Sequence, residues 1–150
     1  MKKNILLKMM SFWPPYFGAG VRIKKMAPDF TSIDVEMKLR FWNQNYVGTH
    51  FGGSLYAMTD PFLMLILMEN LGREYIVWDK AATIRFKKPG KGTVRAHFEI
   101  PKDQIATLKT QVDQAGKIEP VFQVQVLDEA GGVVAEVEKL LYIRKKDAKR

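Results

Sequence analysis

Cysteine is absent from the 150-residue sequence, and histidine occurs only twice, as His50 and His97. The absence of cysteine excludes disulfides, thiolate nucleophiles and metal sites built on cysteine. Two histidines are too few for a histidine-rich metal centre. A serine–histidine–acid triad would depend on His50 alone, because His97 alternates with core positions on a predicted strand. We therefore expect no metal and no bound cofactor.

Phosphate-binding loops are also missing. No Walker-type lysine loop occurs, and the Gly18-x-Gly20 pair leads into a strand pattern rather than a helix, unlike a dinucleotide-binding loop. No apolar run approaches the roughly 20 residues that a membrane-spanning helix needs. In residues 1–20, Lys8 interrupts the apolar run and no small-residue signal-peptidase site follows, unlike in a secretory signal peptide. We therefore interpret this segment as a short amphipathic helix. We expect a cytoplasmic protein.

The net charge of +8 arises from 24 basic and 16 acidic residues, and it suggests an anionic partner. Much of it lies in residues 85–91 and in the basic tail, residues 145–150, which we interpret as a solvated end. A phosphorylated small molecule, a nucleic acid and a membrane surface all carry the matching charge. Scattered aromatic residues weaken a base-stacking platform, and we expect neither nucleic acid nor a membrane as the partner.

Apolar and polar residues alternate in several segments, as in strands with one buried face. These segments are residues 21–24, 33–40, 84–87, 94–100, 122–126 and 133–143. Pro89, Gly90 and Gly92 predict a turn that joins the third and fourth of these strands as a hairpin. Ile105, Leu108 and Val112 recur at helical spacing and predict a surface helix in residues 101–114.

Residues 52–71 are apolar at almost every position, which predicts a buried helix, and Gly72 is suited to end it. If this helix starts at Gly52 and Gly53, their free N–H groups carry the positive end of its dipole. Asp60 then lies two turns further along the same side as Gly53 and Tyr56. Oxyanion donors followed by a carboxylate are a workable arrangement for acyl transfer.

The local signals also allow a different helix start. Asp60 is a favoured N-cap residue and Pro61 is favoured at the first helical position. A proline inside a helix costs about 3 kcal/mol, so Thr59-Asp60-Pro61 alone favours a helix that begins at this point. The glycines would then form a loop, and His50, Ser54 and Tyr56 would have structural roles.

These elements predict one α+β domain, residues 1–150, in which a curved antiparallel sheet of about six strands wraps around one long buried helix. Three segments, NYVGTHFGGSLYAMTD, VWDKAATIRFKKPGKGTVRAHFEIP and GGVVAEVEKLLYIRK, resemble the hotdog-fold acyl-CoA thioesterases. The similarity is closest to a thioesterase-like branch catalogued as a domain of unknown function, and it covers nearly the whole chain.

In that family a buried helix begins at a glycine pair, so the resemblance favours a start near Gly52 and a bend at Pro61. It implies that Gly52 and Gly53 polarise the thioester carbonyl and that Asp60 activates water. Asn45 corresponds to a loop asparagine. The family histidine directly precedes the glycines, whereas Phe51 stands there in this chain and His50 lies one place earlier.

The resemblance implies hydrolysis of an acyl-CoA or acyl carrier thioester, with coenzyme A as part of the substrate. The predicted catalytic residues are Asp60, Gly52, Gly53, Asn45 and His50. The predicted substrate-binding residues are Ser54, Tyr56, Lys87, Lys88 and Lys91. The family places sites between subunits, so a homodimer or homotetramer is expected. The alternatives are a non-catalytic acyl-CoA or fatty-acyl binding protein, a nucleic-acid-binding module and, more weakly, a hotdog dehydratase.

Overall fold

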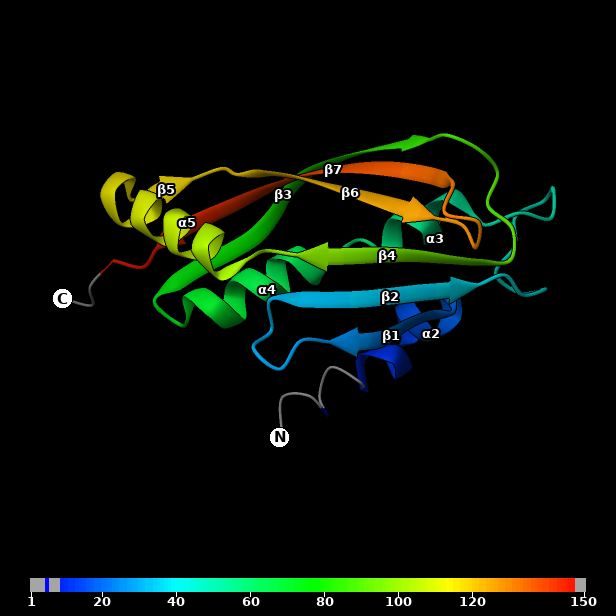
Figure 1. Ribbon diagram of the computed structural model, residues 1–150, viewed down its shortest axis with the longest axis horizontal. Coiled ribbons are helices and arrows are strands. Elements are labelled where there is room, and N and C mark those ends of the chain that lie inside the picture. The colour runs from blue at the N-terminus through cyan, green and yellow to red at the C-terminus, as the bar shows by residue number, and fades with distance from the viewer. Residues whose placement is uncertain (1–4, 6–8, 148–150) are drawn as a thin grey trace.

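A single antiparallel sheet and five helical elements make up the computed structural model, which describes residue 5 and residues 9–147. Two short helices precede the first strand of the sheet. The described chain begins and ends at the periphery of the molecule (Figure 1). In chain order the elements are η1 (Met10–Phe12), α2 (Pro14–Ala19), β1 (Val21–Met26), β2 (Ser32–Lys38), α3 (Gly52–Ala57), α4 (Phe62–Leu71), β3 (Tyr75–Phe86), β4 (Thr93–Glu99), α5 (Lys102–Ala115), β5 (Lys117–Ile118), β6 (Val121–Leu127) and β7 (Val133–Lys145).

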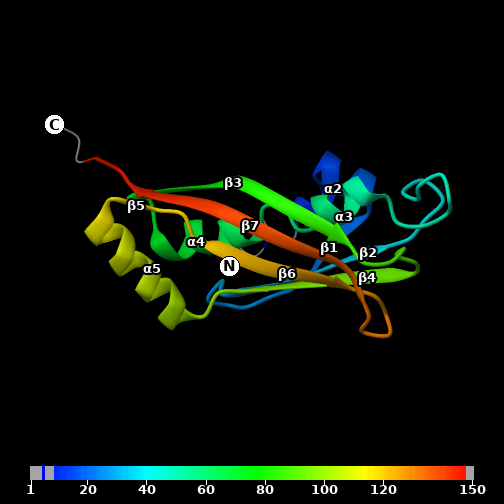
Figure 2. The ribbon, with the colours of Figure 1, turned by 90° about the horizontal axis from the view of Figure 1, so that it is seen from above.

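The strand order is β1-β2-β4-β6-β7-β3, and the two-residue strand β5 also pairs with β7. The sheet curves around α4 and α3, with β3 at one edge (Figure 2). The buried residues of β2, β4 and β6 alternate as the sequence predicts. The predicted α+β architecture is therefore confirmed, with seven strands in place of about six.

The predicted hairpin between residues 84–87 and 94–100 is wrong. β3 pairs with β7 from Tyr75↔Lys145 to Phe86↔Ala135, while β4 pairs with β2 and β6. Both edges of β4 are thus occupied, and the intervening turn crosses to a different part of the sheet. Alternation identifies the buried face of a strand but carries no information about its neighbour.

The predicted single long helix is two helices. It begins at Gly52, as the resemblance implied, but α3 ends at Ala57 and α4 begins at Phe62. Pro61 occupies the N-cap position of α4, and its carbonyl accepts the N–H of Leu65 at 2.8 Å. Because Pro61 has no N–H, the bonding ladder is interrupted at this point rather than bent.

The buried side of α4 consists of Phe62, Leu63, Ile66, Leu67 and Leu71. Gly72 follows with a φ of 92° and ends the helix, as predicted. α5 buries Ile105, Leu108 and Val112, which confirms the predicted surface helix.

Parts of two predicted segments lie outside the described residues. In the N-terminal segment 1–20 these are residues 1–4 and 6–8, and in the tail 145–150 they are residues 148–150. The described part of the N-terminal segment forms η1 and α2. Within the described chain, no helix combines the length and apolar character needed to cross a bilayer.

Candidate active site

The loop before α3 is held by the side chain of Asn45. Its Oδ1 accepts the N–H groups of Val47 and Thr49 at 3.1 and 2.9 Å, and its Nδ2 donates to Thr49 Oγ1 at 2.9 Å. A further, longer bond of 3.4 Å runs from Nδ2 to the carbonyl of His50. The amide of Asn45 therefore has its hydrogen-bonding groups engaged within the loop that leads to the glycine pair.

His50 is buried next to the connection between β3 and β4. Its Nε2 lies 2.9 Å from the carbonyl of Gly92, and its backbone N–H donates to the carbonyl of Gly90 at 2.9 Å. Burial lowers the pKa of the His50 imidazole, and the bond to Gly92 only partly opposes this effect. A neutral ring that donates from Nε2 fits this environment.

The N-terminus of α3 presents the two glycines between phenyl rings. The carbonyl of Phe51 accepts the N–H groups of Ser54 and Leu55, each at 3.0 Å. The N–H groups of Gly52 and Gly53 precede the first intrahelical bond and are the available donors. A Cβ at Gly52 would lie 3.0 Å from the ring of Phe86, and a Cβ at Gly53 would lie 2.7 Å from the ring of Phe51.

Two hollows flank this helix end. The first, the His50 pocket, has a volume of about 420 Å³ and includes five of the predicted site residues. Its lining is Asn45, Val47, Thr49, His50, Gly52, Leu55, Phe86, Lys87, Lys88, Pro89 and Gly90. The second, the Trp42 groove, has a volume of about 540 Å³ and includes Gly53 and Ser54. Its other lining residues are Pro14, Pro15, Gly18, Ala19, Trp42, Asn43, Gln44, Phe51 and Ala57.

The three predicted phosphate-binding lysines are exposed, and two of them already pair with carboxylates. Lys87 Nζ lies 3.6 Å from Glu136 Oε2, and Lys88 Nζ lies 2.5 Å from Asp128 Oδ2. The bond from Lys88 holds the pKa of Asp128 below its usual value. Lys87 and Lys88 also line the His50 pocket, so their charge lies at its wall.

Asp60 lies in the break between α3 and α4. Its side chain does not cap α4, whose N-cap is Pro61, and it is 53% exposed. Asp60 Oδ1 accepts the hydroxyl of Tyr56 at 3.4 Å and the ammonium of Lys139 at 3.4 Å. The alternative in which Asp60 is the N-cap residue of a helix is therefore wrong.

Lys139 is a charged residue on β7 whose side chain is fully buried. Its Nζ donates to the backbone carbonyl of Asp60 at 2.8 Å and lies 3.2 Å from Asp79 Oδ1 on β3. The contact with Asp79 is an ion pair without hydrogen-bond geometry. Lys139 Nζ also lies 5.2 Å from the ring centroid of Tyr56. Together with Tyr16, these residues form what we call the Lys139 cluster.

Tyr16 and Asp79 are the least hydrated acids of the Lys139 cluster. Burial raises the pKa of Asp79, and the positive charge of Lys139 partly offsets this rise. Burial, followed by the negative charges of Asp60 and Asp79, raises the pKa of Tyr16. The Tyr16 hydroxyl has no hydrogen-bond partner among the described residues. It remains protonated and adds a buried donor close to the two carboxylates.

Sequence reasoning missed Lys139, Asp79 and Tyr16, although the first two carried a signal. Lys139 occupies an inward position of β7 between Val137 and Leu141, and Asp79 follows the inward residues Tyr75 and Val77 on β3. A charged residue in an inward series is rare unless it is paired. Two such residues on different strands indicate a buried polar cluster.

Gly52 begins α3, whereas Asp60 lies beyond the last residue of that helix, Ala57, in the break before α4. An N–H donor, a carbonyl oxygen, an attacking water and a general base follow one another at about 3 Å steps. A base in this arrangement must therefore face the hollow in front of the glycine N–H groups. Asp60 lines neither of the two hollows at the glycines.

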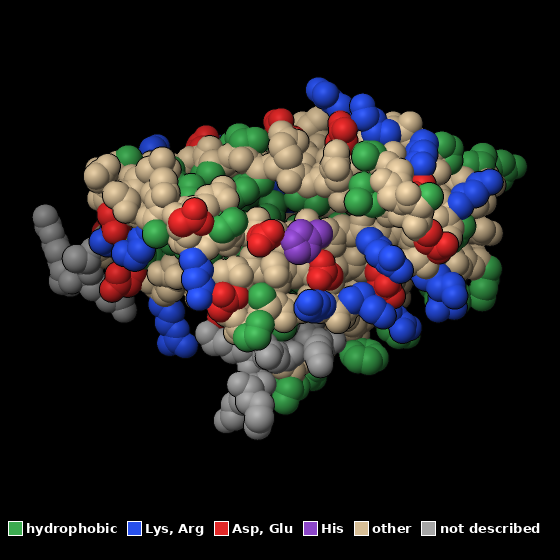
Figure 3. All heavy atoms as spheres, in the orientation of Figure 1, with side chains coloured by type: hydrophobic (Ala, Val, Ile, Leu, Met, Phe, Trp, Pro, Cys, Tyr) green, Lys and Arg blue, Asp and Glu red, His purple; other side chains and the backbone are tan. Residues whose placement is uncertain are grey.

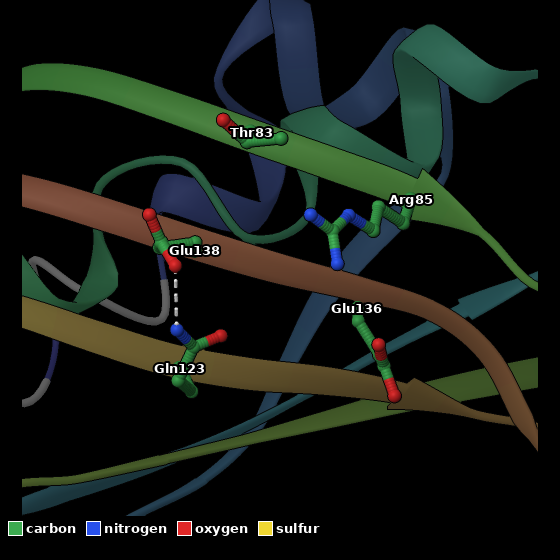
Figure 4. A pocket seen from close by; sticks show the side chains of 5 residues that line it. All are labelled: Thr83, Arg85, Gln123, Glu136 and Glu138. Atoms are coloured by element: carbon green, nitrogen blue, oxygen red, sulfur yellow. Dashed lines mark hydrogen bonds between the residues drawn. The ribbon is translucent and has the colours of Figure 1, made fainter.

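The outer face of the sheet has a different character. A histidine lies among acidic side chains on the face drawn in Figure 3, and His97 Nδ1 is 2.6 Å from Asp34 Oδ1. A small polar hollow of about 100 Å³ lies over β3, β6 and β7, where Gln123 donates to Glu138 at 2.9 Å (Figure 4). Among the described residues, no group of three His, Asp or Glu side chains is placed to hold a metal ion.

Comparison with known sequences identifies the family. A family model described as a domain of unknown function, DUF4442, matches residues 2–143. The chain belongs to this family. The matched range contains the glycine pair, Asp60 and Lys139. No curated protein matches the sequence.

Solved structures establish the fold of this family member. A Pseudomonas aeruginosa protein of unknown function, described as a probable thioesterase, is 22% identical with a TM-score of 0.86, over 97% of each chain. A thioesterase from Haemophilus influenzae is 14% identical with a TM-score of 0.67, over 93% of this chain and 88% of its own. The Escherichia coli PaaI protein of the phenylacetic acid degradation operon is 15% identical with a TM-score of 0.62, over 99% and 96%. The chain has the hotdog fold, as its resemblance implied.

Proposed function

We propose that the protein hydrolyses an acyl thioester, with coenzyme A or an acyl carrier as the thiol, and that Asp60 is the general base. The observation that carries this proposal is the orientation and exposure of the Asp60 carboxylate. Oδ1 is oriented by Tyr56 and Lys139, while half of the side chain remains exposed. Oδ2 is then a fixed acceptor that a water molecule can reach.

The chemistry uses one water molecule. Oδ2 of Asp60 takes a proton from the water molecule while the oxygen of that water forms a bond to the thioester carbonyl carbon. The N–H groups of Gly52 and Gly53 stabilise the negative charge that develops on the carbonyl oxygen. When the carbon–sulfur bond breaks, the proton passes from Asp60 to the thiolate. The products are a carboxylic acid and a free thiol.

Asp60 lines neither hollow at the glycines of its own chain, so the proposed site combines groups from two copies of the chain. β3 is a 12-residue edge strand whose residues from Lys80 to Thr83 are all exposed, and a long exposed edge is a template for pairing. Phe86, at one end of β3, covers Gly52, while Asp79 lies beside Asp60 through Lys139. Antiparallel pairing of two β3 strands about their middle would bring Asp60 of one copy toward Gly52 of the other.

The substrate would lie in the His50 pocket, with Lys87, Lys88 and Lys91 near the phosphates of coenzyme A and the acyl group beside Leu55 and Phe86. Ser54 and Tyr56 would contact the thioester from α3. The descriptions of two similar structures as a probable thioesterase and a thioesterase support this class of reaction.

Thiol release from a panel of acyl-CoA thioesters tests the proposal, with Asp60→Asn as the variant and Asp103→Asn, on exposed α5, as the matched control. We expect turnover of at least one thioester by the wild type and a loss of about 10²- to 10⁴-fold in Asp60→Asn. An unchanged rate in Asp60→Asn would remove Asp60 from the reaction. Binding without turnover by the wild type would instead favour an acyl-CoA binding protein.

A further inference from the structure

The buried lysine on β7 has no role in the family resemblance, and its contacts converge on the residue proposed as the base. Lys139 lies on a strand that is hydrogen-bonded on both sides, by β6 and β3, so its backbone is held within the sheet. An ammonium group has three N–H donors and no acceptor. In this chain the shortest hydrogen bond of the ammonium, at 2.8 Å, goes to the carbonyl of Asp60.

That carbonyl lies outside both helices. The intrahelical bonds of α4 begin with the carbonyl of Pro61, which accepts from Leu65, so the carbonyl of Asp60 is left to another donor. Lys139 supplies this donor and also reaches Asp60 Oδ1 at 3.4 Å. One ammonium therefore fixes both the backbone and the carboxylate of Asp60 at the helix break.

A buried lysine stabilises a core position poorly, because removing its charge from water costs free energy. Replacing buried ion pairs by apolar residues of similar volume is often neutral or stabilising, and the neighbours of Lys139 on the same face of β7, Val137 and Leu141, are apolar and fully buried. Asp79 supplies the compensating negative charge at 3.2 Å. The cation is thus retained in the core next to an exposed carboxylate, a pattern suited to function more than to stability.

We propose that Lys139 is a positioning residue that fixes Asp60 for proton transfer, and that Asp79 holds Lys139 in place. This inference rests on the proposed thioester hydrolysis. The charged and titratable groups facing Lys139 are Tyr56 from α3, Asp60 from the helix break and Asp79 from β3, with Tyr16 from α2 near the two carboxylates.

The first test compares Lys139→Met with the charge-neutral pair Lys139→Met/Asp79→Asn, which does not leave an uncompensated carboxylate in the core. Lys102→Met, on exposed α5, is the matched control. We expect kcat to fall about 100-fold in both Lys139 variants with little change in KM, because a displaced base costs about this much. In Lys139→Met the acidic limb of the pH–rate profile should also move to higher pH, since loss of the cation alone makes the remaining carboxylates easier to protonate.

The second test uses the absence of cysteine. Lys139→Cys introduces the only thiol. Alkylation with 2-bromoethylamine in denaturant, followed by refolding, then gives a lysine analogue in which sulfur replaces the γ-methylene group. We expect this product to recover kcat to within about tenfold of wild type. Alkylation with iodoacetamide, which adds a neutral group, should not restore it.

The outcomes separate the two proposals. An active wild type whose folded Lys139→Met/Asp79→Asn variant keeps its kcat overturns the role of Lys139 and leaves Asp60 as the base. Equal recovery with the charged and the neutral alkylating agents also overturns it, because packing alone would then suffice. A wild type without turnover on any thioester overturns both proposals.

Discussion

His50 Nε2 lies 2.9 Å from the carbonyl oxygen of Gly92, across 42 residues of sequence. The contact fastens the loop before α3 to the connection between β3 and β4, and the backbone bond from His50 to Gly90 runs alongside it. A Cβ at Gly90 would approach the His50 ring to 3.2 Å, so a glycine permits this close packing. The loop that leads to the glycine pair is thereby held by the connection between β3 and β4.

This contact predicts a pH-dependent stability. The folded-state pKa of His50 is depressed below 6.5 by burial, so the unfolded state binds more protons as the pH falls through that value. The contribution of His50 is present above pH 6.5 and is lost below it. We expect His50→Gln, which keeps a donor for Gly92, to flatten the decline in urea midpoint between about pH 7 and pH 5.

The pKa of His97 is shifted in the opposite direction, and the same urea midpoints test its effect on stability. Its pKa is raised above 6.5, mainly by the bond to Asp34, so its stabilising contribution is present below pH 6.5 and is lost as the pH rises through the folded-state value. His97→Gln should therefore steepen the decline toward acid pH. Identical profiles for wild type, His50→Gln and His97→Gln would contradict both assignments.

Lys139 and Asp79 are predicted to be coupled in stability. Lys139→Met leaves Asp79 without its cation, and we expect the free energy of unfolding to fall by about 3 kcal/mol. Adding Asp79→Asn should return more than half of this loss, because the buried charge is then removed. Urea unfolding of the two single variants and the double variant measures the coupling. Additive losses would show that the two side chains do not interact.

The edge of β3 is predicted to be a homodimer contact. Thr83→Lys introduces a charged side chain into the exposed stretch of β3 that would pair, and lysine on a sheet edge disfavours strand pairing. We expect light scattering after size exclusion to give a dimer for wild type and a larger monomer fraction for Thr83→Lys. Thr107→Lys on exposed α5 is the matched control. A monomeric wild type would reject the two-copy site.

The basic residues next to the His50 pocket are predicted to affect binding rather than turnover. For a coenzyme A thioester we expect Lys88→Ala and Lys91→Ala each to raise KM up to about fivefold, since one exposed charge pair contributes at most about 1 kcal/mol. A short thioester that lacks the nucleotide should show no such change. Equal effects on both substrates would mean that the lysines act through the fold of the turn.

Several features were accessible from the sequence because they depend on neighbouring residues. The alternation in residues 33–37 and 94–100 identified the buried faces of β2 and β4, and helical spacing in residues 105–112 identified α5. The start at Gly52 followed from the family resemblance, since the local capping signal at Asp60 favoured a later one. Pro61 indicated a disturbance of the helix but not its extent.

The candidate site was only partly accessible in this way. Asp60 and the glycines were predicted from the sequence, but only the structure shows that Asp60 lies in a break beyond the end of α3. Lys139 and Asp79 lie 60 positions apart and meet only because β3 pairs with β7 along their full lengths. Their inward positions were visible in the alternation, but their contact was not.

The sequence alone determined which faces of β2, β4 and β6 are buried and where α5 lies, because both depend on the periodicity of apolar residues. Tertiary structure decided which strands are neighbours, how completely the helix breaks, and that a buried ammonium reaches the Asp60 carbonyl. Those outcomes depend on long-range pairing, which is set by the packing of the whole sheet around α4 and not by any single segment.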